Sequence, residues 1–199
     1  MLNTGWISPT EGHYDASGSN WSDLDNIISD NDVAASNSVV SGTASKFLYG
    51  TLYGFNIPSS ATIRGIEVKI KRKSAYTENW THLDQNVKMK KSGITVGSNH
   101  ANSNYWGNNY WDSWIYGNST DLWGTTWTPS DINESGFGAG VSCTVLYGTV
   151  IAYVDWIAIK VYYSPYDVYK VNGIERAQLS KINNINFTSV KKLLGLIAN

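Results

Sequence analysis

The chain has 199 residues, enough for one large all-β domain or for a domain of roughly 150 residues with an appendage. Its net charge of −1 gives no electrostatic reason to expect a nucleic-acid partner, and no window approaches the ~20 apolar residues of a membrane span. Nine tryptophans, thirteen tyrosines and eighteen glycines, with only 16% charged residues, favour strands joined by tight turns.

The N-terminal part predicts loops followed by one aromatic strand. Residues 1–45 are rich in Ser, Asn, Asp and Gly, so we expect irregular loops with one or two short strands, the last around 38–41. Residues 46–56 predict a strand in which Phe47, Tyr49, Thr51 and Tyr53 share one face.

The clearest strand is predicted at residues 63–73. Ile66, Val68 and Ile70 alternate with charged residues, and a strand places successive side chains on opposite faces. The apolar side should therefore pack on a core, while the lysines of the other side face solvent.

The remaining pattern completes an all-β fold. Further strands are predicted at residues 86–91, 94–98, 138–146 and 149–163, with a loop-like stretch at 99–119 and a short helical turn at 130–133. Seven to nine short strands at regular spacing are typical of an antiparallel β-sandwich of the jelly-roll kind. We expect this sandwich domain to cover residues 1–164.

Residues 165–199 have a different character and contain an internal repeat. Lys170-Val171-Asn172-Gly173-Ile174 recurs as Lys181-Ile182-Asn183-Asn184-Ile185, and a degenerate copy begins at Lys192. Each unit has too few apolar residues to form a core alone, so the segment predicts oligomerisation or docking, with a flexible polar tail as the alternative. The apolar positions expected to make these contacts are Val171, Ile174, Ile182, Ile185, Leu193 and Leu196.

The residues that usually carry chemistry are scattered. His13, His82 and His100 show no metal-ligand spacing and are expected at the surface, and the single cysteine, Cys143, is expected to be a small buried hydrophobe. Asp30-Asn31-Asp32 suits a turn better than a calcium site, since the full spacing of a calcium-binding loop is absent. We therefore expect no catalytic residue, no metal, no cofactor and no enzymatic activity, with a glycosidase kept only as a weak alternative.

An aromatic cluster within the loop-like stretch is the main candidate for a contact site. It consists of Tyr105, Trp106, Tyr110, Trp111, Trp114 and Tyr116, with asparagines among and before them. Flat rings beside amides suit a sugar, and aromatic anchors in Asn- and Ser-rich loops also suit protein recognition. Inward packing beneath a long loop explains the same residues, so glycan binding, subunit contact and a small core all stay open.

A series of ordered motifs resembles a known class of domain. It runs GFNIP at 54–58, ATIRGIEV at 61–68, STDLWG at 119–124, WTP at 127–129, SGFG at 135–138 and VDWIAIKVYY at 154–163. The series resembles β-sandwich domains of bacteriophage tail, fibre and other virion structural proteins, and similar domains occur in bacterial surface proteins. The C-terminal repeats resemble the Lys-Ile-Asn-Gly-Val units that often end such phage proteins.

The resemblance implies a virion structural protein, a tail, fibre or other appendage component that acts through assembly contacts. Its partners would be other virion proteins and copies of itself, with a host-surface glycan as a further partner. It would be made in the host cytoplasm and reside in the extracellular particle. The alternative function is a carbohydrate-binding or host-receptor-binding module.

Overall fold

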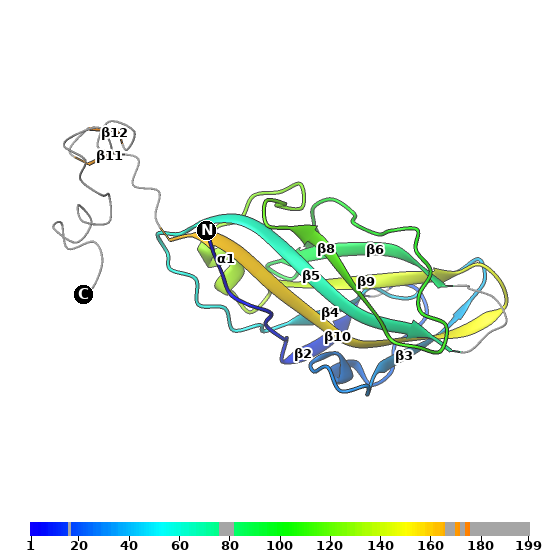
Figure 1. Cartoon of the computed structure of the whole chain (residues 1–199). Helices are drawn as coiled ribbons and strands as arrows, with labels where there is room; N and C mark the ends of the chain where they lie inside the picture. The colour runs from blue at the N-terminus through cyan, green and yellow to red at the C-terminus, as the bar shows by residue number, and fades with distance from the viewer. Residues whose placement is uncertain (16, 76–81, 166–169, 172–173, 176–199) are drawn as a thin grey trace. The chain divides into compact units, whose positions relative to one another are not determined.

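The protein consists of two compact units, Met1–Pro165 and Tyr166–Asn199. The structure is a computed structural model that describes residues 1–15, 17–75, 82–165, 170–171 and 174–175. The first unit is a sandwich of two antiparallel sheets (Figure 1), as the sequence predicts.

The first sheet, sheet A, is built on two long strands. Its order is β1 (Leu2–Asn3), β10 (Thr149–Ser164), β5 (Thr62–Ser74) and β8 (Asp112–Asn118), and β3 (Ala35–Val40) pairs with the first part of β10. The β10–β5 pairing runs along nearly the whole length of β5, from Ala152 opposite Ser74 to Ser164 opposite Thr62. This ladder is interrupted at Asp155, which has no opposing residue in β5.

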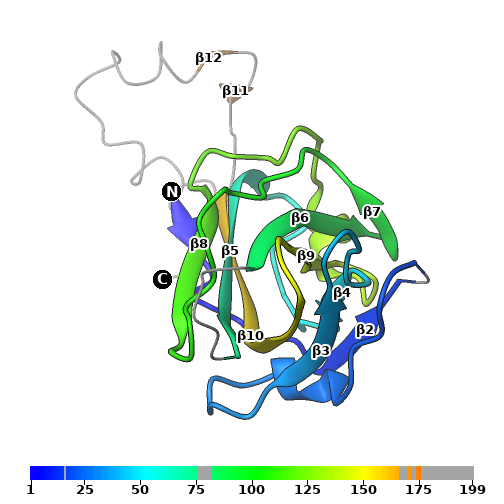
Figure 2. The same cartoon turned by 90° about the vertical axis from the view of Figure 1, so that its right-hand side faces the viewer.

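The second sheet, sheet B, forms the other layer. Its order is β2 (Glu11–Tyr14), β4 (Leu48–Thr51), β9 (Gly138–Val145), β6 (His82–Lys91) and β7 (Ile94–Val96). Figure 2 shows the two layers from the end, with β8, β5 and β10 in one and β6, β9 and β4 in the other.

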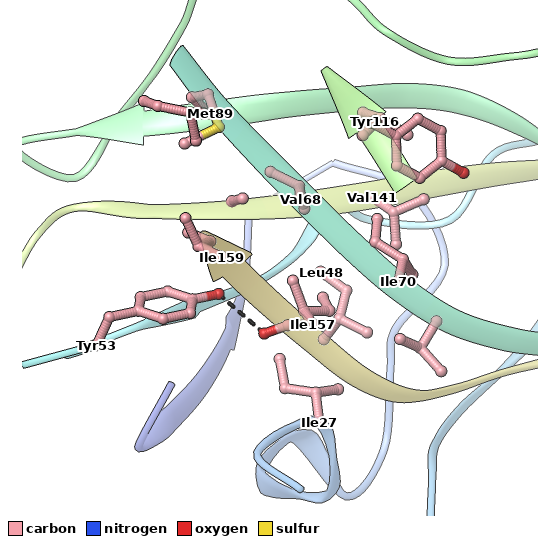
Figure 3. Packing of buried hydrophobic residues seen from close by; sticks show 14 of the residues in the cluster. Ile27, Leu48, Tyr53, Val68, Ile70, Met89, Tyr116, Val141, Ile157 and Ile159 are labelled. Carbon is pink, nitrogen blue, oxygen red and sulfur yellow. Dashed lines mark hydrogen bonds between the residues drawn. The ribbon is translucent and has the colours of Figure 1, made fainter. Parts of the chain in front are cut away.

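Alternating apolar residues of the two sheets meet between the layers (Figure 3). The predicted alternation of β5 is confirmed, since Ile66, Val68 and Ile70 are fully buried. They meet residues of sheet B that are also fully buried. These include Leu48, Val87, Met89, Val141 and Cys143. Each such side chain contributes roughly 1.5–3 kcal/mol by leaving water, so this layer is the main source of stability.

The motifs near residues 119–133 have structural roles at the edge of the core. Trp123 is fully buried and donates its indole N–H to the Ile66 carbonyl oxygen at 2.9 Å. The helix α1 (Pro129–Asn133) begins with a capping box between Thr128 and Asp131, which confirms the predicted helical turn. The Asn133 amide then bonds the backbone of Ile57 in both directions, at 2.8 and 2.9 Å.

Two local predictions are wrong. The stretch 99–119 contains a strand, β8, whose residues do not alternate in polarity as β5 does. In addition, Phe47 and Tyr49 lie on the outer face of sheet B while Tyr53 is buried. The alternation cannot continue past the end of β4, because Leu52 takes a φ of 56°.

The described part of the second unit is one short hairpin. β11 (Lys170–Val171) pairs antiparallel with β12 (Ile174–Glu175), and the sequence between them is Asn-Gly, the pair most typical of two-residue hairpins. This hairpin coincides with the first copy of the repeat, while the second and third copies lie outside the described residues.

The residues that the structure describes include no helix with the length and apolar character needed to cross a bilayer.

Substitution in the core tests this arrangement. Ile157→Ala should lower the free energy of unfolding by about 2–5 kcal/mol, because the removed atoms leave a cavity between fully packed layers. Ile94→Ala, at a position that is 68% exposed, should change it by less than about 0.5 kcal/mol. Urea unfolding followed by tryptophan fluorescence measures both. Equal effects of the two substitutions would contradict the assignment of Ile157 to the core.

Candidate functional site

The predicted aromatic cluster is divided between the core and the surface. Trp106 is fully buried and Trp114 packs partly against the core, whereas Tyr105 and Tyr110 are 42% and 53% exposed. Trp106 therefore packs inward, which is the alternative that the sequence left open for these rings. Trp111 lies elsewhere, beside lysines of β5.

Trp106 is buried because its polar tip has a partner. Its indole N–H donates to Asp84 Oδ1 at 2.9 Å, and the Tyr116 hydroxyl donates to Asp84 Oδ2 at 2.7 Å. Arg72 also donates to Asp84 and to the Tyr116 hydroxyl, so a carboxylate and a guanidinium pair inside the sandwich. Burial lowers the pKa of Arg72 and raises the pKa of Tyr116 to about 12. This group, Arg72, Asp84, Trp106 and Tyr116, is called the buried polar cluster below.

His82 lies beside the buried polar cluster and not at the surface, so the sequence prediction for this histidine is wrong. Its ring stacks on Trp106 with the centroids 5.7 Å apart, and its Nδ1 lies 2.7 Å from Ser74 Oγ. Burial lowers the pKa of His82 to about 4. A serine beside a histidine is the contact that a nucleophile and its base would make, but both residues are almost fully buried. A substrate could not reach this serine, so the pair has a structural role.

The buried histidine makes stability depend on pH. Because the pKa of His82 is near 4 in the folded chain and near 6.5 in the unfolded chain, only the unfolded chain takes up the proton between these values. The free energy of unfolding should therefore fall as pH decreases from 6.5 to 4, by up to about 1.4 kcal/mol per pH unit from this group. Chemical denaturation at a series of pH values measures the slope.

His82→Gln should flatten this slope whatever it does to stability at neutral pH. Ile94→Ala, which removes an exposed side chain that carries no titratable group, is the control and should leave the slope unchanged. An unchanged slope in His82→Gln would show that the acid sensitivity comes from other groups.

The outer face of sheet A carries interleaved aromatic rings and lysines. We call it the aromatic–lysine face, and it comprises Trp6, Lys69, Lys71, Lys73, Trp111, Tyr153, Trp156, Lys160 and Tyr162. All of these side chains are partly exposed, and the pairing of β5 with β10 sets Lys71 opposite Trp156 and Lys73 opposite Tyr153. The predicted solvent-facing lysines are thus placed among rings that the sequence analysis did not connect with them.

The acidic residues considered as a calcium site gather around one of these lysines. Asp32 Oδ1 lies 2.6 Å and Asp155 Oδ2 2.9 Å from Lys71 Nζ, and Asp30 is hydrogen-bonded to the same ammonium. Burial acts to lower the pKa of Lys71, but these hydrogen bonds outweigh it and raise the pKa. The three carboxylates are close enough together to hold a metal ion. The Lys71 ammonium already supplies the positive charge that they require.

A polar hollow lies on the outer face of sheet B. Its volume is about 630 Å³, within the usual range of ligand pockets. It is lined by Ser17, Gly18, Ser19, Val40, Thr43, Ala44, Ser45, Phe47, Gln85, Asn86 and Ser142. None of these lining residues carries a charge, and the hydrogen-bonding groups are hydroxyls and amides. We call this site the polar hollow.

A second, smaller hollow lies beside Tyr49 of β4. It measures about 280 Å³ and is lined by Glu11, His13, Tyr49, Thr51, Leu52, Gly93, Ser135 and Gly136. Phe47 of the polar hollow and Tyr49 of this smaller hollow are partly exposed and stack with centroids 6.1 Å apart and an interplanar angle of 25°. Two aromatic rings therefore connect the two hollows.

The predicted docking residues of the C-terminal repeats are only partly placed. Val171 and Ile174 lie opposite each other in the β11–β12 hairpin. Ile182, Ile185, Leu193 and Leu196 lie outside the described residues. Their role in docking or oligomerisation stays a prediction.

Sequence reasoning missed the hollows and part of the aromatic–lysine face. The hollows arise from loop and strand residues that are far apart in the sequence, such as Ser17, Phe47 and Ser142, and no local pattern links them. A signal for the face did exist in β10, where Trp156, Lys160 and Tyr162 occupy the positions between buried residues.

Comparison with known proteins yields similarities of structure. No protein-family model matches the chain, and no curated protein matches it. The CBM22-1 xylan-binding domain of Paenibacillus barcinonensis Xyn10C has a TM-score of 0.41 and 9% identity, with 80% of this chain and 92% of that domain covered. The module TmCBM61, determined in complex with β-1,4-galactotriose, has a TM-score of 0.38 and 9% identity, covering 78% and 88%.

A bacteriophage protein is also similar. The enzymatically active domain of tailspike protein 4 from bacteriophage CBA120 has a TM-score of 0.37 and 12% identity, with 81% of this chain but 19% of that chain covered. These likenesses are of β-sandwich fold alone. Any ligand of this chain must be inferred from its own residues.

Proposed function

We propose that this protein binds carbohydrate along the outer face of sheet B. The observation that supports this is the pair of hollows connected by the stacked rings of Phe47 and Tyr49. A saccharide chain offers apolar C–H faces, which pack on rings, and hydroxyl groups, which need hydrogen-bonding partners.

The polar hollow suits an uncharged sugar. Gln85 and Asn86 stand at its edge, and each amide has bonding capacity beyond its contact with the Ser142 hydroxyl, at 3.3 and 3.0 Å. A bound sugar ring would lie against Phe47 and exchange hydroxyl hydrogen bonds with these amides. An acidic sugar would find no cation among the residues that line this hollow.

The spacing of the features favours a chain of several sugars. Tyr49 extends the ring surface from Phe47 towards the smaller hollow, and Lys90 Nζ, 4.1 Å from the Tyr49 ring centroid, is ion-paired with Asp15 at 2.9 Å. This pair fixes the tyrosine ring from one side. The rings are thus held in place before a ligand arrives, which lowers the entropy lost on binding.

We propose binding without turnover at this site. Glycoside hydrolysis ordinarily requires two carboxyl groups flanking the scissile bond. Glu11 is the single acidic residue that lines either hollow, and it lies 3.2 Å from His13 Nε2.

Loss of the ring should abolish most of the affinity. On an array of neutral oligosaccharides, followed by calorimetry with the best binder, Phe47→Ala should weaken binding by at least about tenfold. Gln85→Ala should weaken it less, because the exposed amide makes its bonds in competition with water.

Tyr105→Ala is the matched control, since this tyrosine is 42% exposed in the loop that the sequence favours as a contact surface. It should leave neutral-glycan binding unchanged. The proposed site would be contradicted if no oligosaccharide on the array bound. It would also be contradicted if Tyr105→Ala lost binding while Phe47→Ala kept it.

We also propose, separately, the assembly role implied by the resemblance to virion appendage proteins. Its support is the division of the chain at Pro165 and the hairpin formed by the first repeat. In this proposal the C-terminal unit docks on other virion proteins or on copies of itself, and the sandwich is carried as a module.

Truncation tests this second proposal. A chain ending at Pro165 should keep the melting temperature of the sandwich within about 2 °C, because the core lies within Met1–Pro165. It should no longer be incorporated into particles or form oligomers in sedimentation experiments. Incorporation and oligomer formation at the level of the full chain would refute the assembly role of the repeats.

A further inference from the structure

The lysines of the aromatic–lysine face are held by rings. Lys69 Nζ lies 4.6 Å from the centroid of Trp6 and 5.4 Å from that of Trp156. Lys73 Nζ lies 4.2 Å from the centroid of Trp111 and 5.4 Å from that of Tyr153. An ammonium group over two ring faces has few positions open to it, so these cations are ordered before any partner binds.

Lys69 and Lys73 differ from the other two lysines of this face in having no acidic partner among the residues that the structure describes. Lys160 is paired with Glu67 at 2.6 Å, and Lys71 is surrounded by three carboxylates. Within residues 1–15, 17–75 and 82–165, neither Lys69 nor Lys73 contacts a carboxylate. The face therefore presents two fixed ammonium groups that have aromatic neighbours and no acidic ones.

The two groups are well separated along one strand. Lys69 and Lys73 are four residues apart on the same side of β5, which corresponds to about 13 Å. On the next strand, Ile115 opposite Lys69 is 51% exposed, and Ser113 opposite Lys71 is also exposed. On this side Trp111, the residue before β8, lies against Lys73, and Lys69 and Lys73 both stay partly exposed.

We propose that the aromatic–lysine face is a second binding site, for an acidic glycan whose carboxylates pair with Lys69 and Lys73. Sugar rings between the carboxylates would pack their C–H faces against exposed edges of Trp111 and Trp156. The site is independent of the polar hollow, which lies on the opposite sheet and has no charged lining residue.

The charges and rings of this face favour an acidic glycan over a nucleic acid. A nucleic-acid strand carries one phosphate per ~3.4 Å, and proteins that bind it need a strongly positive field. This chain has a net charge of −1, and four acidic groups, Asp30, Asp32, Asp155 and Glu67, pair with the other two lysines of the same face. Two fixed cations among aromatic rings instead suit a ligand that offers carboxylates together with the apolar C–H faces of sugar rings.

The experiment compares a uronic-acid polymer with its uncharged counterpart. The full chain should bind polygalacturonate in affinity electrophoresis and in calorimetry at low ionic strength. It should bind carboxyl-reduced polygalacturonate at least about tenfold more weakly, and added salt should weaken the binding of the acidic polymer alone. Equal binding of the two polymers, or binding of neither, would overturn the proposal.

Substitutions of Lys69 and Lys73 test whether polygalacturonate binds at the aromatic–lysine face. Lys69→Met and Lys73→Met should each weaken binding of the acidic polymer by about fivefold, the effect of losing one partly exposed ion pair. The double Lys69→Arg, Lys73→Arg variant should retain binding, because arginine keeps both the charge and the contact with the rings. Lys88→Met, on the outer side of sheet B, is the control and should have no effect.

Two further measurements complete the test. Phe47→Ala should bind polygalacturonate normally, so a failure of the neutral-glycan proposal stays distinguishable from a failure of this one. Single-stranded DNA or an acidic peptide that binds through Lys69 and Lys73 more tightly than polygalacturonate would assign the face to another class of partner and overturn the proposal.

Discussion

The pairing of β5 with β10 is the constraint on which the rest of the structure depends. Buried and more exposed positions alternate along most of both strands, and their register sets Ile70 opposite Ile157 and Val68 opposite Ile159. The same register sets lysines opposite aromatic or small residues on the other side of the sheet. A shift by one residue would move every side chain to the opposite face, so the core and the aromatic–lysine face are fixed by one interaction.

The irregularity of this pairing at Asp155 is as informative as its regular part. Asp155 is an extra residue in β10, and its carboxylate is fully buried next to Lys71. A buried charge without a partner would cost several kcal/mol, so this ion pair is required once the extra residue is present. Lys71 is consequently committed to its three carboxylates, which distinguishes it from Lys69 and Lys73 on the same strand.

The inner side of the sandwich changes from apolar to polar towards the end of β5. Arg72 and Ser74 continue the inward positions of Ile66, Val68 and Ile70, and they meet Asp84 and His82 of β6. The loop before β8 closes over this end through Trp106, whose amide N–H donates to the His82 carbonyl oxygen at 3.1 Å. The aromatic residues of that loop are therefore explained mainly by the need to cover and bond a buried polar cluster.

These details mark the limit of prediction from sequence. The all-β class, the long strands and the capped turn could be predicted, because period-two alternation and capping residues are local signals. β8 could not, because Ile115, which lies between Trp114 and Tyr116, is apolar although it is 51% exposed. The burial of Arg72 and His82 could not be predicted either, because a buried charge or imidazole depends on partners that are distant in sequence. Trp111 is the residue of the aromatic–lysine face that the sequence analysis had named as a contact candidate. Its lysine neighbours lie about 40 residues away in the sequence, so their proximity could not be predicted.

The two outer faces of the sandwich differ in chemistry for a physical reason. On sheet A, lysines of β5 face aromatic residues of neighbouring segments across a continuous surface. The lysine ammonium groups therefore lie over aromatic rings. On sheet B, the central strand β9 carries Gly138, Gly140 and Ser142 on its outer side. A Cβ at Gly140 would lie 2.1 Å from the Leu48 carbonyl oxygen and 2.6 Å from the Tyr49 Cβ, so only glycine fits beside β4 at this position. These small residues leave space above the sheet between larger side chains. Because hydroxyls and amides line this space, it suits uncharged ligand groups. Because the core isolates the two faces from each other, each can be changed by substitution without altering the ligand chemistry of the other.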